Sequence, residues 1–274
     1  MFDFLATMAE SSRSRAEATR RRFGVTGLSS RAVSARPAQP LVLSSDGFDL
    51  IAEAKLTSPA DGPLLTDSDP QGAVVKLARS YAEAGAAAVS VLTEPTRFDG
   101  HLEYLEAAAS AVGVPMLCKD FLVDPIQVIQ ARAAGASGVL LIAKMMDSSL
   151  LQEMTAVANE LGMFALVEIF DERDLELASV VFDAGVFVGV NSRNLTTLDV
   201  DSRCLASLAP LLPEHLPWVA ESGVRTFADA AAAARLGYRL ALVGTALVTS
   251  NEPGVTTRAM IAAGRKARRA EPVS

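Results

Sequence analysis

The chain has 274 residues, of which 50% are apolar and 21% charged, a composition typical of a globular protein with one large α/β barrel or two modest domains. The formal net charge of −7 argues against nucleic-acid binding, which needs clustered lysine and arginine, and no apolar run reaches the roughly 20 residues of a membrane-spanning helix. With two cysteines and two histidines, the chain offers neither a disulfide framework nor a metal-ligand set, so a small-molecule partner is expected.

We expect residues 1–48 to form an N-terminal helical extension and connector. The first residues mix apolar and arginine positions, as a transit peptide does, but the acids Asp3, Glu10 and Glu17 are unusual in such peptides. A helix packed on the body of the protein is therefore favoured. Residues 25–48 contain two prolines together with serines and glycines, which is typical of an extended connector.

From about residue 49, short apolar runs alternate with longer Ala/Leu/Glu-rich segments. Eight runs are predicted to be strands: Leu50–Ala54, Ala88–Thr93, Pro115–Lys119, Gly138–Ala143, Phe164–Ile169, Val186–Val190, Pro217–Glu221 and Leu240–Gly244. Eight segments have helical spacing: Gly72–Ala84, Leu102–Ala111, Pro125–Ala134, Ser149–Leu161, Glu172–Val180, Arg203–Leu208, Ala228–Leu236 and Thr256–Ala270. Strands that are apolar on both faces indicate a parallel sheet covered by helices.

This alternation predicts that residues 49–274 form a (β/α)8 TIM barrel, so that residues 1–274 make a single α/β domain. An open doubly wound sheet is the structural alternative, because alternation alone does not prove that the sheet closes. In either case the carboxyl ends of the strands are expected to carry the functional residues.

Polar or aromatic side chains follow the predicted strands at their carboxyl ends. Several stand two residues apart, as do Glu53 and Lys55 or Lys119 and Phe121, and side chains two apart on a strand point the same way. The strand-end set is Glu53, Lys55, Ser58, Thr93, Glu94, Phe98, Lys119, Phe121, Lys144, Glu168, Asn191, Arg193, Glu221, Ser222, Gly244 and Thr245. In a barrel these residues converge on one mouth.

Seven ordered motifs together resemble the indole-3-glycerol phosphate synthase family. They are Ile51–Pro59, Val89–Glu94 with Phe98–Gly100, Lys119–Phe121, Leu166–Ile169, Asn191–Leu195, Ala220–Gly223 and Val243–Gly244. The resemblance covers nearly the whole chain from about residue 49, in the family's order and spacing. It implies a cytoplasmic carbon–carbon lyase of tryptophan biosynthesis, a carboxy-lyase that uses neither cofactor nor metal and exists as a monomer or weak homodimer. Its substrate is the anionic phosphosugar 1-(2-carboxyphenylamino)-1-deoxyribulose 5-phosphate, which closes to indole-3-glycerol phosphate with loss of CO2 and water.

The resemblance also implies residue roles. Lys119 matches the general acid that protonates the ribulose carbonyl, a step suited to a positioned ammonium because negative charge develops on that oxygen. Glu168 matches the carboxylate of the dehydration step, and Lys55 a second lysine that contacts substrate; which lysine serves which step stays open. The family's apolar pocket for the anthranilate ring corresponds to Phe98, Phe121, Leu140 and Leu195. Its polar shell corresponds to Glu53, Asn191, Arg193, Glu221 and Ser222. Its phosphate end corresponds to Ser58, Gly223, Gly244 and Thr245.

The sequence departs from the family at the phosphate end. Thr57 and the segment Ala60–Gly62 stand where more basic residues are common, and Gly244–Leu247 replaces a pattern that usually carries serine or glutamate followed by serine. Thr245 keeps a hydroxyl group. These departures put the affinity for phosphate and the motion of the first loop in question more than the type of reaction.

Two other functions fit parts of the pattern. Another phosphosugar-binding barrel, such as phosphoribosylanthranilate isomerase, usually relies on a cysteine and an aspartate, but Cys118 directly precedes Lys119, so strand parity turns it away from the mouth. A barrel that only binds a ligand or partner is the second alternative, and missing catalytic groups would favour it. Singly, each residue also has a structural explanation: a strand-end lysine reaches water easily, and Glu168 could form a structural ion pair. Lys144, read singly, is expected to be a surface or helix-start residue.

Overall fold

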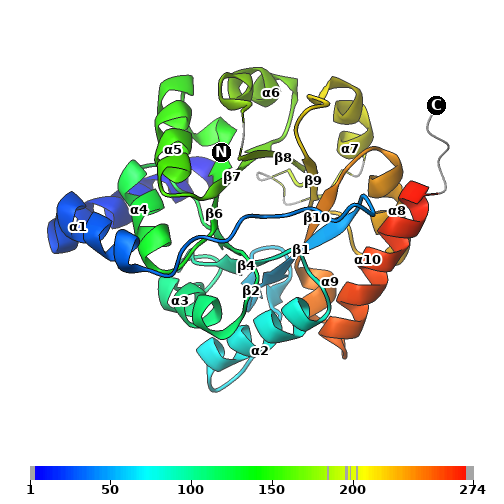
Figure 1. Ribbon diagram of the computed structural model, residues 1–274, viewed down its shortest axis with the longest axis horizontal. Helices are drawn as coiled ribbons and strands as arrows, with labels where there is room; N and C mark the ends of the chain where they lie inside the picture. The colour runs from blue at the N-terminus through cyan, green and yellow to red at the C-terminus, as the bar shows by residue number, and fades with distance from the viewer. Residues whose placement is uncertain (1–3, 184, 195–196, 198, 202, 270–274) are drawn as a thin grey trace.

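The computed structural model describes residues 4–183, 185–194, 197, 199–201 and 203–269. Eight parallel strands close into a barrel in the order β1-β10-β9-β8-β7-β6-β5-β4, with helices around it (Figure 1). The strands are β1 (Asp49–Ala54), β4 (Ala88–Leu92), β5 (Met116–Lys119), β6 (Gly138–Ile142), β7 (Phe164–Ile169), β8 (Val186–Asn191), β9 (Trp218–Glu221) and β10 (Leu240–Val243). The predicted (β/α)8 barrel is confirmed, and the open sheet is excluded.

The outer layer is made of the helices that follow the strands. They are α2 (Pro70–Glu83), α3 (Leu102–Ala111), α4 (Pro125–Ala133), α5 (Ser148–Glu160), α6 (Glu172–Ala178), α7 (Arg203–Leu208), α8 (Phe227–Arg235) and α10 (Pro253–Arg269), with the 3-10 turns η1 (Ala143–Met145), η2 (Ser179–Val181) and η3 (Ala209–Leu211). These bounds differ from the predicted ones by a few residues at most. Among the described helices, none combines the length and apolar character that crossing a membrane requires.

Short polar side chains fix where several helices begin. Four aspartates accept hydrogen bonds from backbone N–H groups of the first turn that follows them: Asp69, Asp124, Asp147 and Asp171. Helix α8 begins with a reciprocal capping box between Thr226 and Asp229. Each such cap stabilises its helix by about 1 kcal/mol, so the loops at the mouth turn into helices at defined positions.

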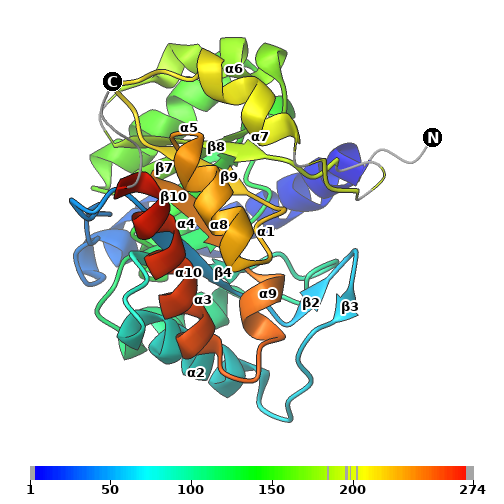
Figure 2. The ribbon, with the colours of Figure 1, turned by 90° about the vertical axis from the view of Figure 1, so that its right-hand side faces the viewer.

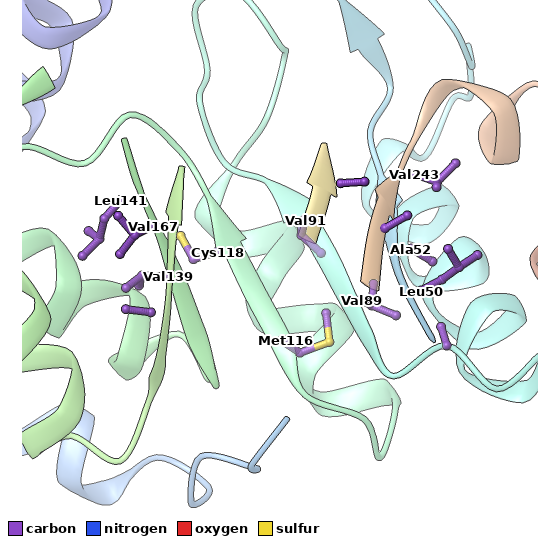
Figure 3. Close-up of a cluster of buried hydrophobic side chains, with 14 of the residues drawn as sticks. Leu50, Ala52, Val89, Val91, Met116, Cys118, Val139, Leu141, Val167 and Val243 are labelled. Carbon is purple, nitrogen blue, oxygen red and sulfur yellow. The ribbon is translucent and has the colours of Figure 1, made fainter. Parts of the chain in front are cut away.

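Strand alternation divides the apolar residues into two layers. Side chains such as Leu50, Val89 and Cys118 lie between the sheet and the helices (Figure 3), whereas Leu117 and Leu166 belong to the separate cluster inside the barrel. The inward-facing row of each strand therefore continues into the strand-end residues of the mouth. Because Cys118 faces the helices, its successor in the strand faces the barrel axis.

The N-terminal extension is a long helix, α1 (Phe4–Ser34), that packs along α4 on the outside of the barrel (Figure 1). The prediction of an extended connector over residues 25–48 is wrong for its first part, because the helix resumes after a kink at Gly24, where φ is +62°. Leu28 lies beyond the kink and is buried in a cluster with Ile126 of α4. Burial of this apolar face outweighs the local signals for a connector, and the extended segment begins only after Ser34.

Two small elements at the mouth were not predicted. The strands β2 (Thr57–Ser58) and β3 (Gly62–Pro63) form an antiparallel hairpin, which projects from the barrel (Figure 2). The short helix α9 (Thr245–Val248) directly follows β10. Elements of two to four residues are too short to show a hydrophobic period, so their sequences gave no sign of them.

Candidate active site

A pocket at the carboxyl ends of the barrel strands gathers the predicted site residues. Those that line it are Glu53, Lys55, Ser58, Phe98, Lys119, Phe121, Leu140, Glu168, Asn191, Arg193, Glu221, Ser222, Gly223, Gly244 and Thr245. Among the residues that the family resemblance assigns a role, Leu195 lies outside the described residues. Barrel closure thus brings together side chains that are spread along the chain from β1 to the start of α9.

Lys119 stands at the centre of this pocket, at the end of β5. Its ammonium donates to Glu221 Oε2 at 3.1 Å and to Glu168 Oε2 at 3.4 Å. Burial alone would lower the pKa of Lys119, but the neighbouring carboxylates, Glu221 first, outweigh it and raise the pKa above the usual lysine value. Lys119 therefore carries its proton at neutral pH and can act as a hydrogen-bond or proton donor.

Glu168, at the penultimate position of β7, is held in place by an amide. Asn191 Nδ2 donates to Glu168 Oε1 at 3.0 Å, and Asn191 Oδ1 accepts from the backbone N–H of Arg193 at 2.9 Å. One carboxylate oxygen of Glu168 thus faces Asn191 and the other faces Lys119. A buried carboxylate held in this way has few alternative rotamers, so its direction toward the pocket is fixed.

Glu221, at the end of β9, is almost fully buried. Burial raises the pKa of Glu221 well above the usual carboxyl value; Lys119 opposes this shift and Glu168 adds to it. Space for its carboxylate depends on Gly189, because a Cβ there would overlap Glu221 Oε1. Sequence reasoning missed Gly189, although a glycine inside an otherwise apolar β-strand is a signal of close approach.

A second ion pair lies across the pocket at the end of β1. Lys55 Nζ is 2.9 Å from Glu53 Oε1. Burial would raise the pKa of Glu53, but the cations Lys55, Lys119 and Arg193 outweigh it and lower the pKa. Gly244 makes room for this pair, because a Cβ at that position would overlap Glu53 Oε1.

One wall of the pocket is aromatic. The Phe98 and Phe121 rings have their centroids 5.9 Å apart, and Phe4 of α1 meets Phe121 edge to face at 5.7 Å. Phe4 lines the pocket and was not predicted, since nothing in the first residues indicates contact with a strand end more than one hundred positions later. The wall is large and apolar enough to accept a flat aromatic ligand.

Asp120 ties this part of the pocket to the N-terminal helix. Its carboxylate receives two hydrogen bonds from the Arg15 guanidinium, at 2.8 and 2.7 Å, one from Thr93 Oγ1 at 2.9 Å and one from the Phe121 backbone N–H at 2.7 Å. Bidentate pairs of this kind are strong and directional. Arg15 and Asp120 therefore fix the backbone that carries Lys119 and Phe121, a support that sequence reasoning missed.

The opposite end of the pocket is lined by hydroxyl groups and glycines. Ser222 has a φ of +61° and Gly223 a φ of +76°, and Ser192 Oγ donates to the carbonyl oxygens of Glu221 and Ser222, at 3.2 Å each. A serine in this backbone region is strained and is often found at functional sites. The turn after β9 is thus held with its backbone against the pocket.

Three residues of the strand-end set lie elsewhere. Thr93 binds Asp120 behind the pocket, and the Glu94 carboxylate accepts backbone N–H groups of its own loop. Lys144 pairs with Asp171 at 3.2 Å on the surface. Convergence on the pocket is therefore wrong for Thr93 and Glu94, because bonds to neighbouring groups satisfy them first. Lys144 lies on the surface, as expected from reading it singly as a surface or helix-start residue.

Cys118 bears on the cysteine-dependent alternative. It is 1% exposed and packs between the sheet and the helices, and burial raises the pKa of its thiol to about 12. A thiol that faces away from the pocket and keeps its proton is unsuited to acid–base work there. The parity argument that turned Cys118 away from the mouth is confirmed.

Comparisons with known proteins place the chain in a family. A family model described as indole-3-glycerol phosphate synthase matches residues 5–260. A protein of that name from Mycobacterium tuberculosis (strain CDC 1551 / Oshkosh) is 42% identical over 255 residues, which cover 91% of each chain. Another, from Mycobacterium sp. (strain KMS), is 42% identical over 243 residues, covering 88% of this chain and 87% of the relative.

Two solved structures share the fold at low sequence identity. 3-Hexulose-6-phosphate synthase from Salmonella typhimurium superposes with a TM-score of 0.64 at 14% identity, covering 80% of this chain and 100% of that one. Thiamine phosphate pyrophosphorylase from Pyrococcus furiosus gives 0.59 at 16% identity, covering 81% and 98%. At these identities the likeness is one of fold alone.

Proposed function

This chain belongs to the indole-3-glycerol phosphate synthase family and is thus a carboxy-lyase of tryptophan biosynthesis, and on that premise we propose how its pocket carries out the reaction. The substrate is 1-(2-carboxyphenylamino)-1-deoxyribulose 5-phosphate, and the product is indole-3-glycerol phosphate. The observation that carries the proposal is the Lys119 ammonium between two buried carboxylates. An aromatic wall on one side and hydroxyl groups on the other match the two ends of this substrate.

The first step joins the ring to the sugar. The arene carbon that bears the carboxylate attacks the ketone carbon, and the ketone oxygen takes a proton from Lys119. Loss of CO2 returns its electron pair to the ring and restores aromaticity. The raised pKa of Lys119 suits this role, because the ammonium keeps its proton until the oxygen becomes basic in the transition state.

The second step removes water. Glu168 accepts a proton from the methylene carbon next to the nitrogen, while the hydroxyl left by the first step departs as water with a proton from a lysine ammonium. Lys55 still carries its proton at this point, whereas Lys119 can be the second donor only after it has regained one from solvent. The hydrogen bond from Asn191 leaves Glu168 with one oxygen turned toward the lysine, which supports its use as a base in this confined position.

Each end of the substrate has its own binding groups in this proposal. The anthranilate ring is held by apolar side chains: Phe98, Phe121, Leu140 and Leu195. The phosphate is held through hydroxyl and backbone N–H groups of Ser58, Gly223, Gly244 and Thr245. A polar shell lies between these two ends and consists of Glu53, Asn191, Arg193, Glu221 and Ser222.

The charges of the pocket are balanced before substrate arrives. Three cations face three carboxylates: Lys55, Lys119 and Arg193 against Glu53, Glu168 and Glu221. Paired groups of opposite sign can stay charged in a confined cleft. The phosphate and carboxylate groups of the substrate would therefore need further donors, which backbone N–H groups supply.

We also propose a cytoplasmic enzyme that exists as a monomer or weak homodimer, as membership of the family implies.

An activity assay tests the proposal directly. Purified protein is incubated with the anthranilate-derived ribulose phosphate, and indole fluorescence is followed for the unaltered chain and for Lys119→Ala and Glu168→Gln. Loss of a general acid or base is expected to lower kcat about 100- to 10,000-fold. Lys144→Ala is the matched control, because Lys144 also follows a barrel strand but lies on the surface. Absence of product from the unaltered chain would overturn the proposed function, and unchanged turnover in both variants would overturn the roles.

A further inference from the structure

The loop after β1 places a carboxylate at the proposed phosphate end. Asp61 Oδ2 accepts hydrogen bonds from Ser58 Oγ at 3.2 Å and from Thr245 Oγ1 at 3.3 Å. Ser58 belongs to the β2–β3 hairpin and Thr245 begins α9, so one carboxylate oxygen joins two segments from opposite ends of the barrel sequence. Both hydroxyl groups are the ones proposed to bind the substrate's phosphate.

Neither hydroxyl can donate to Asp61 and to a phosphate at the same time. A serine or threonine hydroxyl has one proton to donate, and here both protons are donated to Asp61. Ser58 Oγ also accepts from the backbone N–H groups of Ala60 and Asp61, at 3.3 and 3.4 Å. A phosphate oxygen can therefore receive these two protons only if the hydroxyls give up Asp61, which would leave its carboxylate without these donors beside a dianion.

Exposure and charge both favour withdrawal of the Asp61 carboxylate. Ser58 is buried, whereas Asp61 is exposed and is followed by Gly62 with a φ of +73°, so the acidic side chain can turn outward into water without disturbing the serine. A dianion next to a retained carboxylate would be repelled, which gives a direct physical reason for displacement.

We propose that Asp61 is a displaceable occupant of the phosphate end: it holds the Ser58 and Thr245 hydroxyls when the pocket is empty, competes with the phosphate group for them, and so sets the affinity for phosphorylated substrate. This inference rests on the proposed function, because it takes these hydroxyls as phosphate ligands. Asp61 touches no reacting atom in this scheme. Its removal should therefore change KM and leave kcat nearly constant.

Two substitutions separate charge from occupancy. Asp61→Ala removes both the charge and the acceptor, and KM should fall at least about tenfold, as expected when a like charge beside a dianion is removed. Asp61→Asn keeps an acceptor oxygen without charge, and its KM should lie between that of Asp61→Ala and that of the unaltered chain. Asp67→Asn is the control, since Asp67 is an exposed acid of the same segment whose side chain accepts from the backbone of Asp69. Thermal melting checks that all variants are folded.

Steady-state kinetics supply the readout, with inorganic phosphate as a competitive inhibitor and the dephosphorylated substrate as a comparison. The inference expects KM and the inhibition constant of phosphate to fall together in Asp61→Ala, with no change for the dephosphorylated substrate. Turnover by the unaltered chain combined with an unchanged KM and inhibition constant in Asp61→Ala would overturn the inference and leave the proposed function standing. Equal effects of Asp67→Asn would also overturn it, because they would show a diffuse charge effect. Absence of turnover in the unaltered chain would instead overturn the proposed function.

Discussion

The two ends of the pocket are built in different ways. Lys119, Glu168 and Glu221 stand on three barrel strands, are mostly or fully buried and bond one another directly. Ser58 and Thr245 belong to a hairpin and a short helix and are joined through the exposed Asp61. Groups fixed on strands have one arrangement, whereas groups on loops can exchange partners. The comparison suggests that the chemistry is anchored in the barrel and that affinity is adjusted in the loops.

Among the four variants considered next, Gly189→Ala should lower the unfolding free energy most, because it acts at the end of the pocket that is built on the barrel strands. The added Cβ would overlap Glu221 Oε1, so the buried carboxylate must shift away from Lys119. Overpacking of this kind costs about 1–3 kcal/mol of unfolding free energy, and kcat should fall with it. Denaturant unfolding and the fluorescence assay measure both. Gly113→Ala is the control, since a Cβ there meets nothing within 4 Å; equal stability of the two variants would contradict the account.

Arg15→Ala should have the next largest effect, because it removes the support behind Phe121 and Lys119. The variant leaves the buried carboxylate of Asp120 without its bidentate partner. We expect the unfolding free energy to fall by about 1–2 kcal/mol and kcat to fall as well. Arg20→Ala breaks a comparable pair to Asp124 that is more exposed, for which about 0–1 kcal/mol is expected. Thermal melts of the two variants in parallel would sharpen the comparison, and a larger loss in Arg20→Ala would contradict it.

Glu221→Gln should change how stability depends on pH. A carboxyl whose pKa is raised in the folded state binds more protons folded than unfolded, so the unfolding free energy falls as pH rises from the ordinary carboxyl value through the raised one. Each pKa unit of difference between the folded and unfolded states contributes about 1.4 kcal/mol to the unfolding free energy. Urea unfolding across this pH range should show a smaller decline of the unfolding free energy in the glutamine variant. An identical slope in both proteins would mean that the pKa of Glu221 is not raised.

Thr245→Val should have the smallest effect and should act on the loop-borne end alone. It removes one of the two hydroxyls that Asp61 accepts from, so KM for the phosphorylated substrate should rise by about tenfold or less, while kcat and the melting temperature stay near those of the unaltered chain. Thr245→Ser keeps the hydroxyl and should retain the original KM. A large fall in kcat would show that the phosphate end also takes part in the chemistry.

The same contrast explains what the sequence could predict. Strand parity after apolar runs was enough to aim residues such as Lys119 and Glu168 into one pocket, because alternation on a buried strand leaves only two directions. The N-terminal residues Phe4 and Arg15 were missed, since their partners Phe121 and Asp120 lie more than one hundred positions away. The family match nevertheless begins at residue 5, well before the first recognisable motif.

Local signals were also uneven in value. Glycine within β8 was visible in the sequence, yet only the position of Glu221 shows why Gly189 is needed. The segment around Asp61 was recognised as a departure from the family, but two-residue strands carry no period that could have predicted the hairpin or its bond to Thr245. Leu195 remains a prediction for the anthranilate pocket.

A crystal structure of the Glu168→Gln variant with bound substrate would show which end of the pocket holds each part of the substrate. We expect Lys119 Nζ to lie about 3 Å from the ketone oxygen, with the ring against Phe121 and the phosphate on Ser58 and Thr245. A substrate bound in the reverse direction, with its phosphate on Lys119 and its ketone remote from both lysines, would contradict this expectation.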